Sequence, residues 1–369
     1  MKMKRHGARR LGRYAAFAAL WVVLAAIFFA ARRGAADHRA VQCVEDMRIE
    51  VDGRDAATFL SEETVRDWVL SYDCNPLGLA LKDVDMAALE SSIEANDAVA
   101  DANVYLTSGG RVEIDVRQRR PLMRLMVDGY DLYVAADGYV FAAPPRSSIY
   151  VPVVTGDYRP LFGAAYSGHA HAMARDSIAR IEERIDAWER DKMPLYRALQ
   201  QCSRAMKKLS SQRASKGWFT SDEEYAVRCE QLELYKAQRR GELTAEAKSV
   251  QGRIDDLTRN QEGERKRQKK LEKIEEDFSK LINFVDIIQH DDFWRSEIVQ
   301  IVAHGGGERE LEIELIPRSG RHTIIFGRAD DIERKLSDLD AFYRNVLTNI
   351  GWDKYRTVSV KYKGQVVCR

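Results

Sequence analysis

The sequence predicts an α+β protein with an N-terminal transmembrane helix, a small α/β domain, and a second α+β domain interrupted by a long antiparallel coiled-coil hairpin. Three observations predict this architecture. Residues 14–31 form an uncharged apolar run that has no counterpart later in the chain. Short runs in 45–165 and 290–369 alternate between apolar and polar side chains, the period of β-strands. In 170–289, apolar residues recur instead at three- and four-residue spacing, the period of a helix face.

The apolar run Tyr14–Ala31 is expected to span a membrane. As a helix it is about 27 Å long, at about 1.5 Å per residue, which is enough to cross the bilayer core. The tail 1–13 is more densely basic than the segment after the run, so we expect the tail in the cytoplasm and the body outside it. A cleaved signal peptide is the alternative, although charges follow the run where a small-residue cleavage site would lie.

Composition excludes several classes. The formal net charge is +1, and the charges are spread along the 369 residues, so a nucleic-acid-binding protein has no support. The five cysteines include no Cys-x-x-Cys pair, which argues against zinc-ribbon or thioredoxin-like chemistry. Cys43 lies too far beyond the apolar run, and lacks a small residue before it, to be a lipoprotein cysteine. About 330 residues beyond the run suffice for two or three domains.

Residues 45–118 are expected to form the first domain of the body. The expected elements are a strand at Met47–Val51, a helix capped by Ser61, a helix from about Asp85, and strands at 99–107 and 111–116. Apolar residues at helical spacing are expected to face the sheet, namely Val65, Trp68, Val69, Tyr72, Met86, Leu89 and Ile93. The order is strand, helix, helix, strand, strand.

This order and its motifs resemble a POTRA domain, with a generic small α/β domain as the alternative. The motifs are Val84-Asp85, Leu89-Glu90, Ala102-Asn103-Val104, Val112-Glu113-Ile114 and the closing Gln118-Arg119-Arg120-Pro121. The closing motif is similar to the point where a POTRA domain passes into the next domain in the FtsQ/DivIB family of division proteins.

A second α+β domain is expected from residues 119–165 together with 290–369. Expected strands are 123–128, 132–135, 139–141, 151–155, 297–303, 311–315, 322–326, 357–362 and 365–367, with a helix over 330–350.

This domain resembles the β domain of the FtsQ/DivIB family. The motifs are Asp292-Phe293-Trp294, Leu315-Ile316-Pro317-Arg318-Ser319-Gly320, Ile325-Phe326-Gly327, Phe342-Tyr343, Gly351-Trp352 and Val358-Ser359-Val360-Lys361-Tyr362. The resemblance covers residues 1–165 and 290–369 in the family's order of basic tail, single span, POTRA domain and β domain. The insertion at 170–289 departs from the family pattern.

The insertion is expected to be a coiled-coil hairpin with seam residues on two arms. The seam residues are Ile178, Ile181, Ile185, Trp188, Leu195, Leu199, Cys202, Met206 and Leu209, then Tyr225, Cys229, Leu232, Leu243, Ala247, Val250, Ile254, Leu257, Leu271, Ile274, Phe278, Leu281, Val285 and Ile288. Ser221-Asp222-Glu223-Glu224 has the form of a capping box at the start of the second arm. Pro194 is expected to kink or restart the first arm.

A turn centred between Ser215 and Lys216 would set the register of this predicted hairpin. It sets Cys202 opposite Cys229, Trp188 opposite Leu243 and Ile181 opposite Val250. Cys202 and Cys229 could then form a disulfide outside the cytoplasm, and two seam residues that stay reduced are the alternative.

No catalytic residue, metal site or cofactor is expected. His169 and His171 could bind a metal, but no third ligand is apparent, and acidic pairs such as Asp291-Asp292 are explained by helix starts. An enzyme such as a peptidoglycan hydrolase would need a nucleophile or base, and no catalytic motif supplies one.

The resemblance implies a non-enzymatic division scaffold in the cell inner membrane at the septum, with a periplasmic body. Its implied partners are FtsB-like and FtsL-like proteins, bound by β-augmentation at the C-terminal edge strand, and other division proteins that contact the POTRA domain. The strand maps onto Thr357–Tyr362, with Thr357, Ser359 and Lys361 toward the partner, Val358 and Val360 toward the core, and Tyr355 and Tyr362 nearby. The alternative is an envelope coiled-coil scaffold that binds mainly through its helical hairpin.

Overall fold

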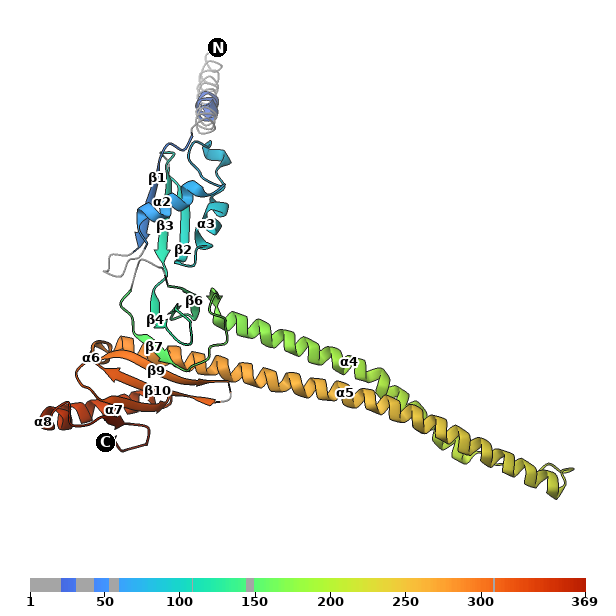
Figure 1. Ribbon diagram of the computed structural model, residues 1–369. Helices are drawn as coiled ribbons and strands as arrows, with labels where there is room; N and C mark the ends of the chain where they lie inside the picture. The colour runs from blue at the N-terminus through green and yellow to red at the C-terminus, as the bar shows by residue number, and fades with distance from the viewer. Residues whose placement is uncertain (1–20, 31–42, 53–59, 108, 144–148, 308) are drawn as a thin grey trace, which may run out of the picture. The chain divides into compact units, whose positions relative to one another are not determined.

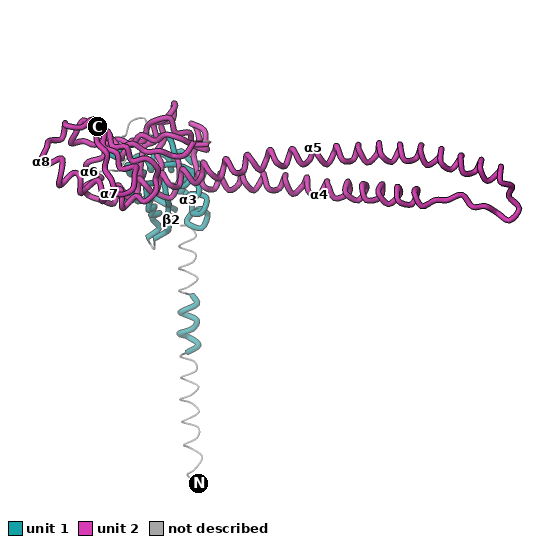
Figure 2. Tube along the Cα trace, turned by 90° about the horizontal axis from the view of Figure 1, so that it is seen from below, with its two compact units in different colours: residues 1–121, 141–151 teal, residues 122–140, 152–369 magenta. Residues whose placement is uncertain are grey.

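The computed structural model describes residues 21–30, 43–52, 60–107, 109–143, 149–307 and 309–369 (Figure 1). Two compact units divide the chain. Unit 1 comprises residues 1–121 and 141–151, and unit 2 comprises 122–140 and 152–369 (Figure 2).

The predicted tail 1–13 and most of the predicted span Tyr14–Ala31 lie outside the described residues. Residues 21–30 are helical. Among the helices of the described ranges, none is long and apolar enough to cross a membrane.

Unit 1 has the predicted order of elements. These are β1 (Met47–Asp52), α2 (Glu62–Ser71), the short 3-10 helix η1 (Leu81–Asp83), α3 (Met86–Glu94), β2 (Val99–Leu106) and β3 (Val112–Gln118). The sheet order is β1-β3-β2, with β1 parallel and β2 antiparallel to β3. The chain crosses over through α2 and α3 between β1 and the β2–β3 hairpin, as a parallel pair requires.

Local sequence signals explain both helices of unit 1. The Ser61 hydroxyl accepts a hydrogen bond from the Thr64 N–H and begins α2, and the Asp85 carboxylate accepts one from the Ala88 N–H and begins α3. Because apolar residues recur at three- and four-residue spacing, each helix buries one face. Val65, Val69, Leu89 and Ile93 are fully buried in the core of this unit, as predicted.

Unit 2 contains most of a ten-stranded mixed sheet. In chain order its strands are β4 (Pro121–Leu125), β5 (Leu132–Ala135), β6 (Tyr139–Ala142), β7 (Val153–Gly156), β8 (Gly168–His169), β9 (Ile298–Gly306), β10 (Arg309–Pro317), β11 (Thr323–Arg328), β12 (Thr357–Ser359) and β13 (Val367–Cys368). The sheet order is β13-β12-β11-β10-β9-β7-β4-β5-β6-β8. Strand β7 pairs in parallel with β9 and so joins the parts of the sheet that precede and follow the long helices.

Helices complete the core of unit 2. They are α4 (Ala170–Ser211), α5 (Asp222–His290), α6 (Asp292–Glu297) and α7 (Ile332–Phe342), followed by a π-helical turn (Tyr343–Leu347) and α8 (Thr348–Ile350). The last turns of α5 pack on the sheet, where Phe284 lies 4.8 Å from Phe326 between ring centroids. Burial of this end of α5 therefore anchors the long helices to the sheet.

Helices α4 and α5 run side by side and leave the sheet together, and we call residues 170–290 the helical arm (Figures 1 and 2). All of the predicted seam residues are buried or half-buried. The capping box at Ser221 and Glu224 is present at the start of α5. Helix α4 continues through Pro194 without a break. Coiled-coil packing of the two helices stays a prediction.

The predicted register of the arm is wrong in the half that lies nearer the sheet. Gln261 donates hydrogen bonds to the Ile185 carbonyl at 3.0 Å and to Glu189 at 3.1 Å, so Gln261 rather than Leu243 lies opposite Trp188. The physical reason is the connection between the helices. The chain reverses at the turn 217–220, so the residues before this turn run alongside the start of α5 and α4 is shifted along its partner (Figure 2).

Candidate functional site

The C-terminal strands β12 and β13 and the loop 360–366 form the C-terminal hairpin. Val358 lies opposite Cys368 and Ser359 opposite Val367 in an antiparallel pair. On its other side β12 is parallel to β11, with Val358 opposite Ile324. Gly364, with a φ of 71°, lies in the loop that reverses the chain, a conformation that glycine adopts without strain.

This hairpin corrects the prediction of one edge strand over Thr357–Tyr362. Strand β12 covers only 357–359, and β13 lies outside it at the end of the described sheet. The predicted closing strand 365–367 overlaps β13, and its pairing with β12 was not predicted. Gly364 between two short alternating runs was the available signal for a hairpin.

The hydrogen bonds identify which backbone groups face outward. Thr357 and Arg369 exchange both of their bonds, each 3.0 Å long. Because such pairs alternate with pairs whose groups point apart, the N–H and C=O of Cys368 point away from β12, as do those of Val366. Two residues of β13 and its loop thus present backbone groups along the outer side of the hairpin.

The side chains of β12 alternate as predicted. Val358 and Val360 are buried in the core of unit 2. Thr357 and Ser359 are half-buried on the opposite face, which continues into the exposed Lys361.

The two predicted tyrosines differ in environment. Tyr362 is exposed in the hairpin loop. Tyr355 is half-buried, with its ring 6.2 Å from that of Phe342 between centroids. Tyr355 therefore packs the segment just before β12 against the end of α7, while Tyr362 is accessible to a partner.

Lys361 connects the hairpin to the rest of the sheet. Its Nζ lies 2.6 Å from Glu312 Oε1 on β10, and this hydrogen bond raises the pKa of Lys361. The side chain crosses β11 at Gly327, where an added Cβ would come within 2.8 Å of Lys361 Cγ. Gly327 therefore provides the space that the lysine occupies.

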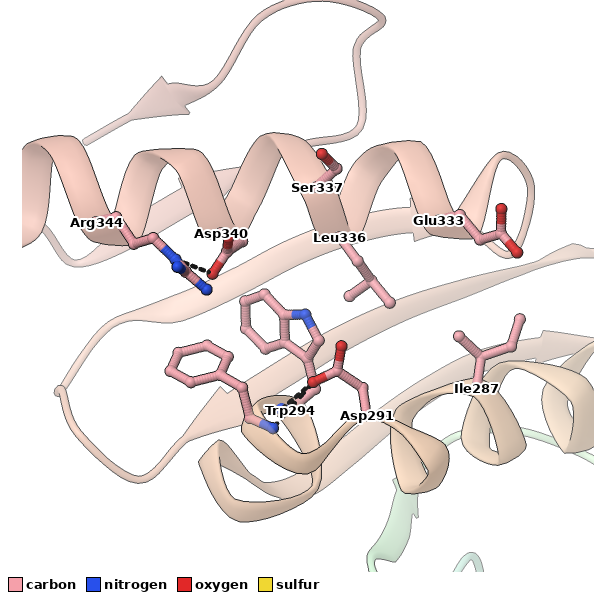
Figure 3. Close-up of a pocket in the computed structure, with 9 residues that line it drawn as sticks. Ile287, Asp291, Trp294, Glu333, Leu336, Ser337, Asp340 and Arg344 are labelled. Carbon is pink, nitrogen blue, oxygen red and sulfur yellow. Dashed lines mark hydrogen bonds and ion pairs between the residues drawn. The ribbon is translucent and has the colours of Figure 1, made fainter.

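A pocket of about 380 Å³ lies in unit 2 between α7 and the junction of α5 and α6 (Figure 3). Its walls include Trp294 and Leu336. Asp291 Oδ1 accepts hydrogen bonds from the N–H groups of Phe293 and Trp294, and Arg344 Nε donates to Asp340 Oδ1 at 2.9 Å. These carboxylates cap a helix or pair with a cation, which are structural roles.

Buried titratable groups near the hairpin also have structural roles. Lys335 Nζ donates to the Arg328 carbonyl at 2.8 Å and to Asp330, whose pKa the lysine lowers. His322 Nε2 lies 2.9 Å from Tyr343 Oη, and burial lowers the pKa of His322. The hydrogen bonds of Lys335 connect α7 to the end of β11. The contact between His322 and Tyr343 joins the π-helical turn to the sheet.

The two candidate metal ligands are directed to other partners. His171 Nδ1 lies 2.9 Å from Glu275 Oε1 and so links α4 to α5. The His169 ring packs edge-on against Tyr139, 4.9 Å between centroids. Within the part of the chain that the structure describes, no three His, Cys, Asp or Glu residues are grouped to hold a metal ion.

Cys202 and Cys229 are both free, with Cys202 buried and Cys229 half-buried. The predicted register, which sets Cys202 opposite Cys229, does not hold in the half of the arm that lies nearer the sheet. Cys202 lies ten residues beyond Lys192, which donates to Gln261, so continuing this register places Cys202 near Gln251 rather than Cys229. The disulfide itself stays a prediction.

Two comparisons with protein families give matches. Residues 262–369 match the family described as FtsQ/DivIB, C-terminal related, and residues 42–117 match the POTRA-like domain. The first match includes the end of α5 and the C-terminal hairpin, and the second includes all strands of unit 1 except the last residue of β3. A comparison with curated proteins finds no match.

Proposed function

We propose that this chain, which belongs to the FtsQ/DivIB family, binds FtsB-like and FtsL-like proteins through its C-terminal hairpin and links them to septal wall synthesis. The family is one of non-enzymatic cell-division scaffolds associated with the membrane at the division site. Its members have division proteins as partners. The identity of the partners and the surface that binds them are the proposed parts.

The outward backbone groups of Val366 and Cys368 carry this proposal. An edge strand with unpaired N–H and C=O groups is a template for an incoming strand, and such β-augmentation needs little side-chain complementarity. The free edge is short, so the exposed side chains on the loop have to contribute as well. Lys361 and Tyr362 lie there, and Lys361 is held in place by Glu312.

The residues proposed for partner contact divide into two roles. Backbone pairing is assigned to β13 and its loop, because β12 is already paired on both sides. Side-chain contact is assigned to the face of Thr357, Ser359 and Lys361. Val358 and Val360 act indirectly, since their burial fixes which face β12 presents.

The membrane topology completes the proposal. The run Tyr14–Ala31 would anchor the protein once in the inner membrane, with tail 1–13 in the cytoplasm and the body in the periplasm. The POTRA-like domain, proposed over residues 45–118, would contact other division proteins. The β domain would comprise 119–165 and 290–369, with 170–289 as an insertion.

The test is a proline substitution at an outward-facing donor. Cys368→Pro removes an N–H that no strand of the described sheet uses, and edge strands tolerate proline where the missing N–H faces outward. We expect capture of FtsB-like and FtsL-like proteins from the same cell to fall, while the melting temperature stays close to wild type. Cys368→Ala is the matched control and should bind normally.

The control separates backbone from side-chain effects. Equal capture by Cys368→Pro and wild type, with the fold intact, would rule out pairing at this edge. Loss of capture in Cys368→Ala as well would assign the effect to the thiol side chain instead.

A second candidate function is favoured by the length of the helical arm. The alternative is an envelope scaffold that binds partners mainly through this arm. Deletion of 176–288 and truncation after Trp352 distinguish the two, provided that each variant retains its fold. Capture lost only on truncation supports the hairpin, and capture lost only on deletion supports the arm.

A further inference from the structure

The far end of the helical arm exposes two adjacent aromatic side chains. Trp218 and Phe219 are 96% and 97% exposed, more than any other large apolar side chain of the described residues. For comparison, Trp294 in the same unit is 3% exposed. Large aromatic side chains contribute most when buried, so an adjacent pair left in water at one point of the surface indicates a contact site.

Local structure holds this pair outward. The Thr220 N–H donates to the Gly217 carbonyl at 3.2 Å, which closes a turn with Trp218 and Phe219 at its two central positions. Lys216 Nζ pairs with the Asp222 carboxylate and lies 5.9 Å from the centre of the Tyr225 ring. These two contacts with the start of α5 thus hold Lys216, the residue that precedes the turn, in place. The turn is therefore a defined part of the arm.

Charge around the turn is asymmetric. Residues 201–220 contain five basic residues and no Asp or Glu, and we call this segment the basic tip. Arg213 and Lys216 lie in the connection that leads to the turn, and Arg204, Lys207 and Lys208 lie in the last turns of α4. The acidic residues of the next ten positions are partly engaged, since Asp222 pairs with Lys216 and Glu224 completes the capping box. Six basic against four acidic residues leave 201–230 at +2, although the whole chain is only +1.

The arm carries the tip far from the sheet. Between Asp222 and Phe278, where α5 reaches the core of unit 2, the helix is about 84 Å long at about 1.5 Å per residue. The tip can therefore meet a broad surface without obstruction by the sheet of its own unit. Figures 1 and 2 show the turn at the end of the arm in both views.

We propose that the basic tip docks on an anionic phospholipid bilayer, with Trp218 and Phe219 inserted at the boundary between headgroups and acyl chains. Aromatic rings favour this boundary, and Lys and Arg are attracted to the lipid phosphates. A protein partner fits less well. Two rings offer about 300–500 Å², below the roughly 800 Å² that each partner contributes to a protein interface of standard size. Insertion into lipid needs no complementary pocket. This inference does not depend on the hairpin's proposed partners.

The test is vesicle flotation with the full chain held in phosphatidylcholine nanodiscs. The discs accommodate the N-terminal apolar run, so binding of added vesicles reports on the rest of the chain. We expect co-flotation with vesicles of three parts phosphatidylcholine to one part phosphatidylglycerol, and little with phosphatidylcholine alone. Trp218→Ser/Phe219→Ser should reduce binding at least about ten-fold. Arg213→Ser should reduce it about five-fold, whereas Arg204, Lys207 and Lys208 lie on α4, several helical turns from the aromatic pair, and their replacement should change binding little.

The matched control replaces a second exposed pair on the same arm. Leu234 and Tyr235 are 67% and 54% exposed on α5, so Leu234→Ser/Tyr235→Ser removes a second exposed pair, of smaller exposed area, without changing the turn. We expect it to bind like wild type. Trp218 also gives a direct readout. The difference in tryptophan emission between wild type and Trp218→Phe is the emission of Trp218, and vesicles that contain dibrominated phosphatidylglycerol should quench it.

Four outcomes would overturn the proposal. These are no binding of wild type to the anionic vesicles, unchanged binding of the Trp218→Ser/Phe219→Ser variant, equal binding to neutral vesicles, and binding that follows Leu234 and Tyr235 instead. Tip-dependent association of the discs with one another, without vesicles, would assign the tip to a second copy of the chain. Circular dichroism of each variant checks that the arm remains helical.

Discussion

Lys361 Nζ lies 2.6 Å from Glu312 Oε1, and this ion pair joins the C-terminal hairpin to β10 across the intervening strand β11. The crossing is possible because residue 327 is glycine. Gly327 has a φ of 77°, lies opposite Ile313 next to an irregularity of the β10–β11 pair, and leaves room for the lysine stem. The position of the hairpin thus depends on a residue that the hairpin itself does not contain.

Gly327→Ala should destabilise unit 2 by about 1–2 kcal/mol or more. A left-handed backbone conformation alone costs a non-glycine residue about 1–2 kcal/mol, and the added Cβ would also displace Lys361. Lys361→Ala alone should cost only about 0.5 kcal/mol, since the ion pair is partly exposed. Urea unfolding of both single variants and the double variant measures the coupling.

The double variant provides the control for this prediction. Because removal of the lysine stem relieves the steric part, the double variant should be more stable than the sum of the single effects predicts. Strict additivity would show that Gly327 is needed for its backbone conformation alone.

Asp277→Asn should raise the free energy of unfolding at pH 7 by about 1 kcal/mol. Asp277 on α5 is buried, its Oδ2 has no hydrogen-bond partner among the described residues, and burial raises its pKa. A raised pKa in the folded state means that the ionised form costs stability, and that stability increases as the pH falls through this pKa. The advantage of the variant should therefore shrink toward pH 4.

Thermal unfolding from pH 4 to pH 8 measures this effect. Glu276→Gln is the matched control, because Glu276 is exposed and its pKa is lowered by Lys280, so the variant should gain no stability at pH 7. A pH-independent difference between Asp277→Asn and wild type would contradict the assignment.

Gln261→Leu should destabilise the helical arm by about 2–3 kcal/mol, because it leaves the buried Lys192 without its Gln261 acceptor. The double variant Lys192→Met/Gln261→Leu should return to within about 1 kcal/mol of wild type, since apolar replacement of both buried partners is often neutral. Helix ellipticity during thermal unfolding reports on both. If the double variant is as unstable as Gln261→Leu, the two side chains do not act as a pair.

The register of the arm can be tested by cross-linking. Ile185→Cys/Gln261→Cys places two thiols where the structure brings the helices together, and mild oxidation should join them. Trp188→Cys/Leu243→Cys follows the register expected from the sequence and should remain reduced. The predicted Cys202–Cys229 disulfide is tested by alkylating the wild-type protein in denaturant without reductant and identifying the labelled cysteines. Labelling of both Cys202 and Cys229 would rule the disulfide out, and protection of these two alone would support it.

Much of the fold could be predicted because its signals are local. Ser61 and Asp85 cap the helices of unit 1, and the apolar spacing identifies Val65 and Leu89 as core residues. The seam residues of the arm and the capping box at Ser221 were found in the same way. Caps depend on neighbours three residues apart, and periodicity depends only on the turn of a helix or the pleat of a strand.

The candidate site could be predicted only in part. Alternation was sufficient to place Val358 and Val360 in the core, because it depends on the strand alone. It could not identify Val366 and Cys368 as the residues with outward backbone groups, since this depends on which strand is outermost. Nor could it identify Glu312 as the partner of Lys361, because the two residues lie on different strands far apart in the sequence.

The sequence by itself determined most of the elements, their order, the faces they bury and the families that the chain resembles. Only the tertiary structure decided how the long helices align, which strand closes the sheet, and which charges, such as those of Lys192 and Asp277, become buried. The features that the sequence determined depend on interactions within one element or turn. The features that only the tertiary structure decided depend on contacts between distant segments, and the local pattern is equally compatible with several alignments of those segments.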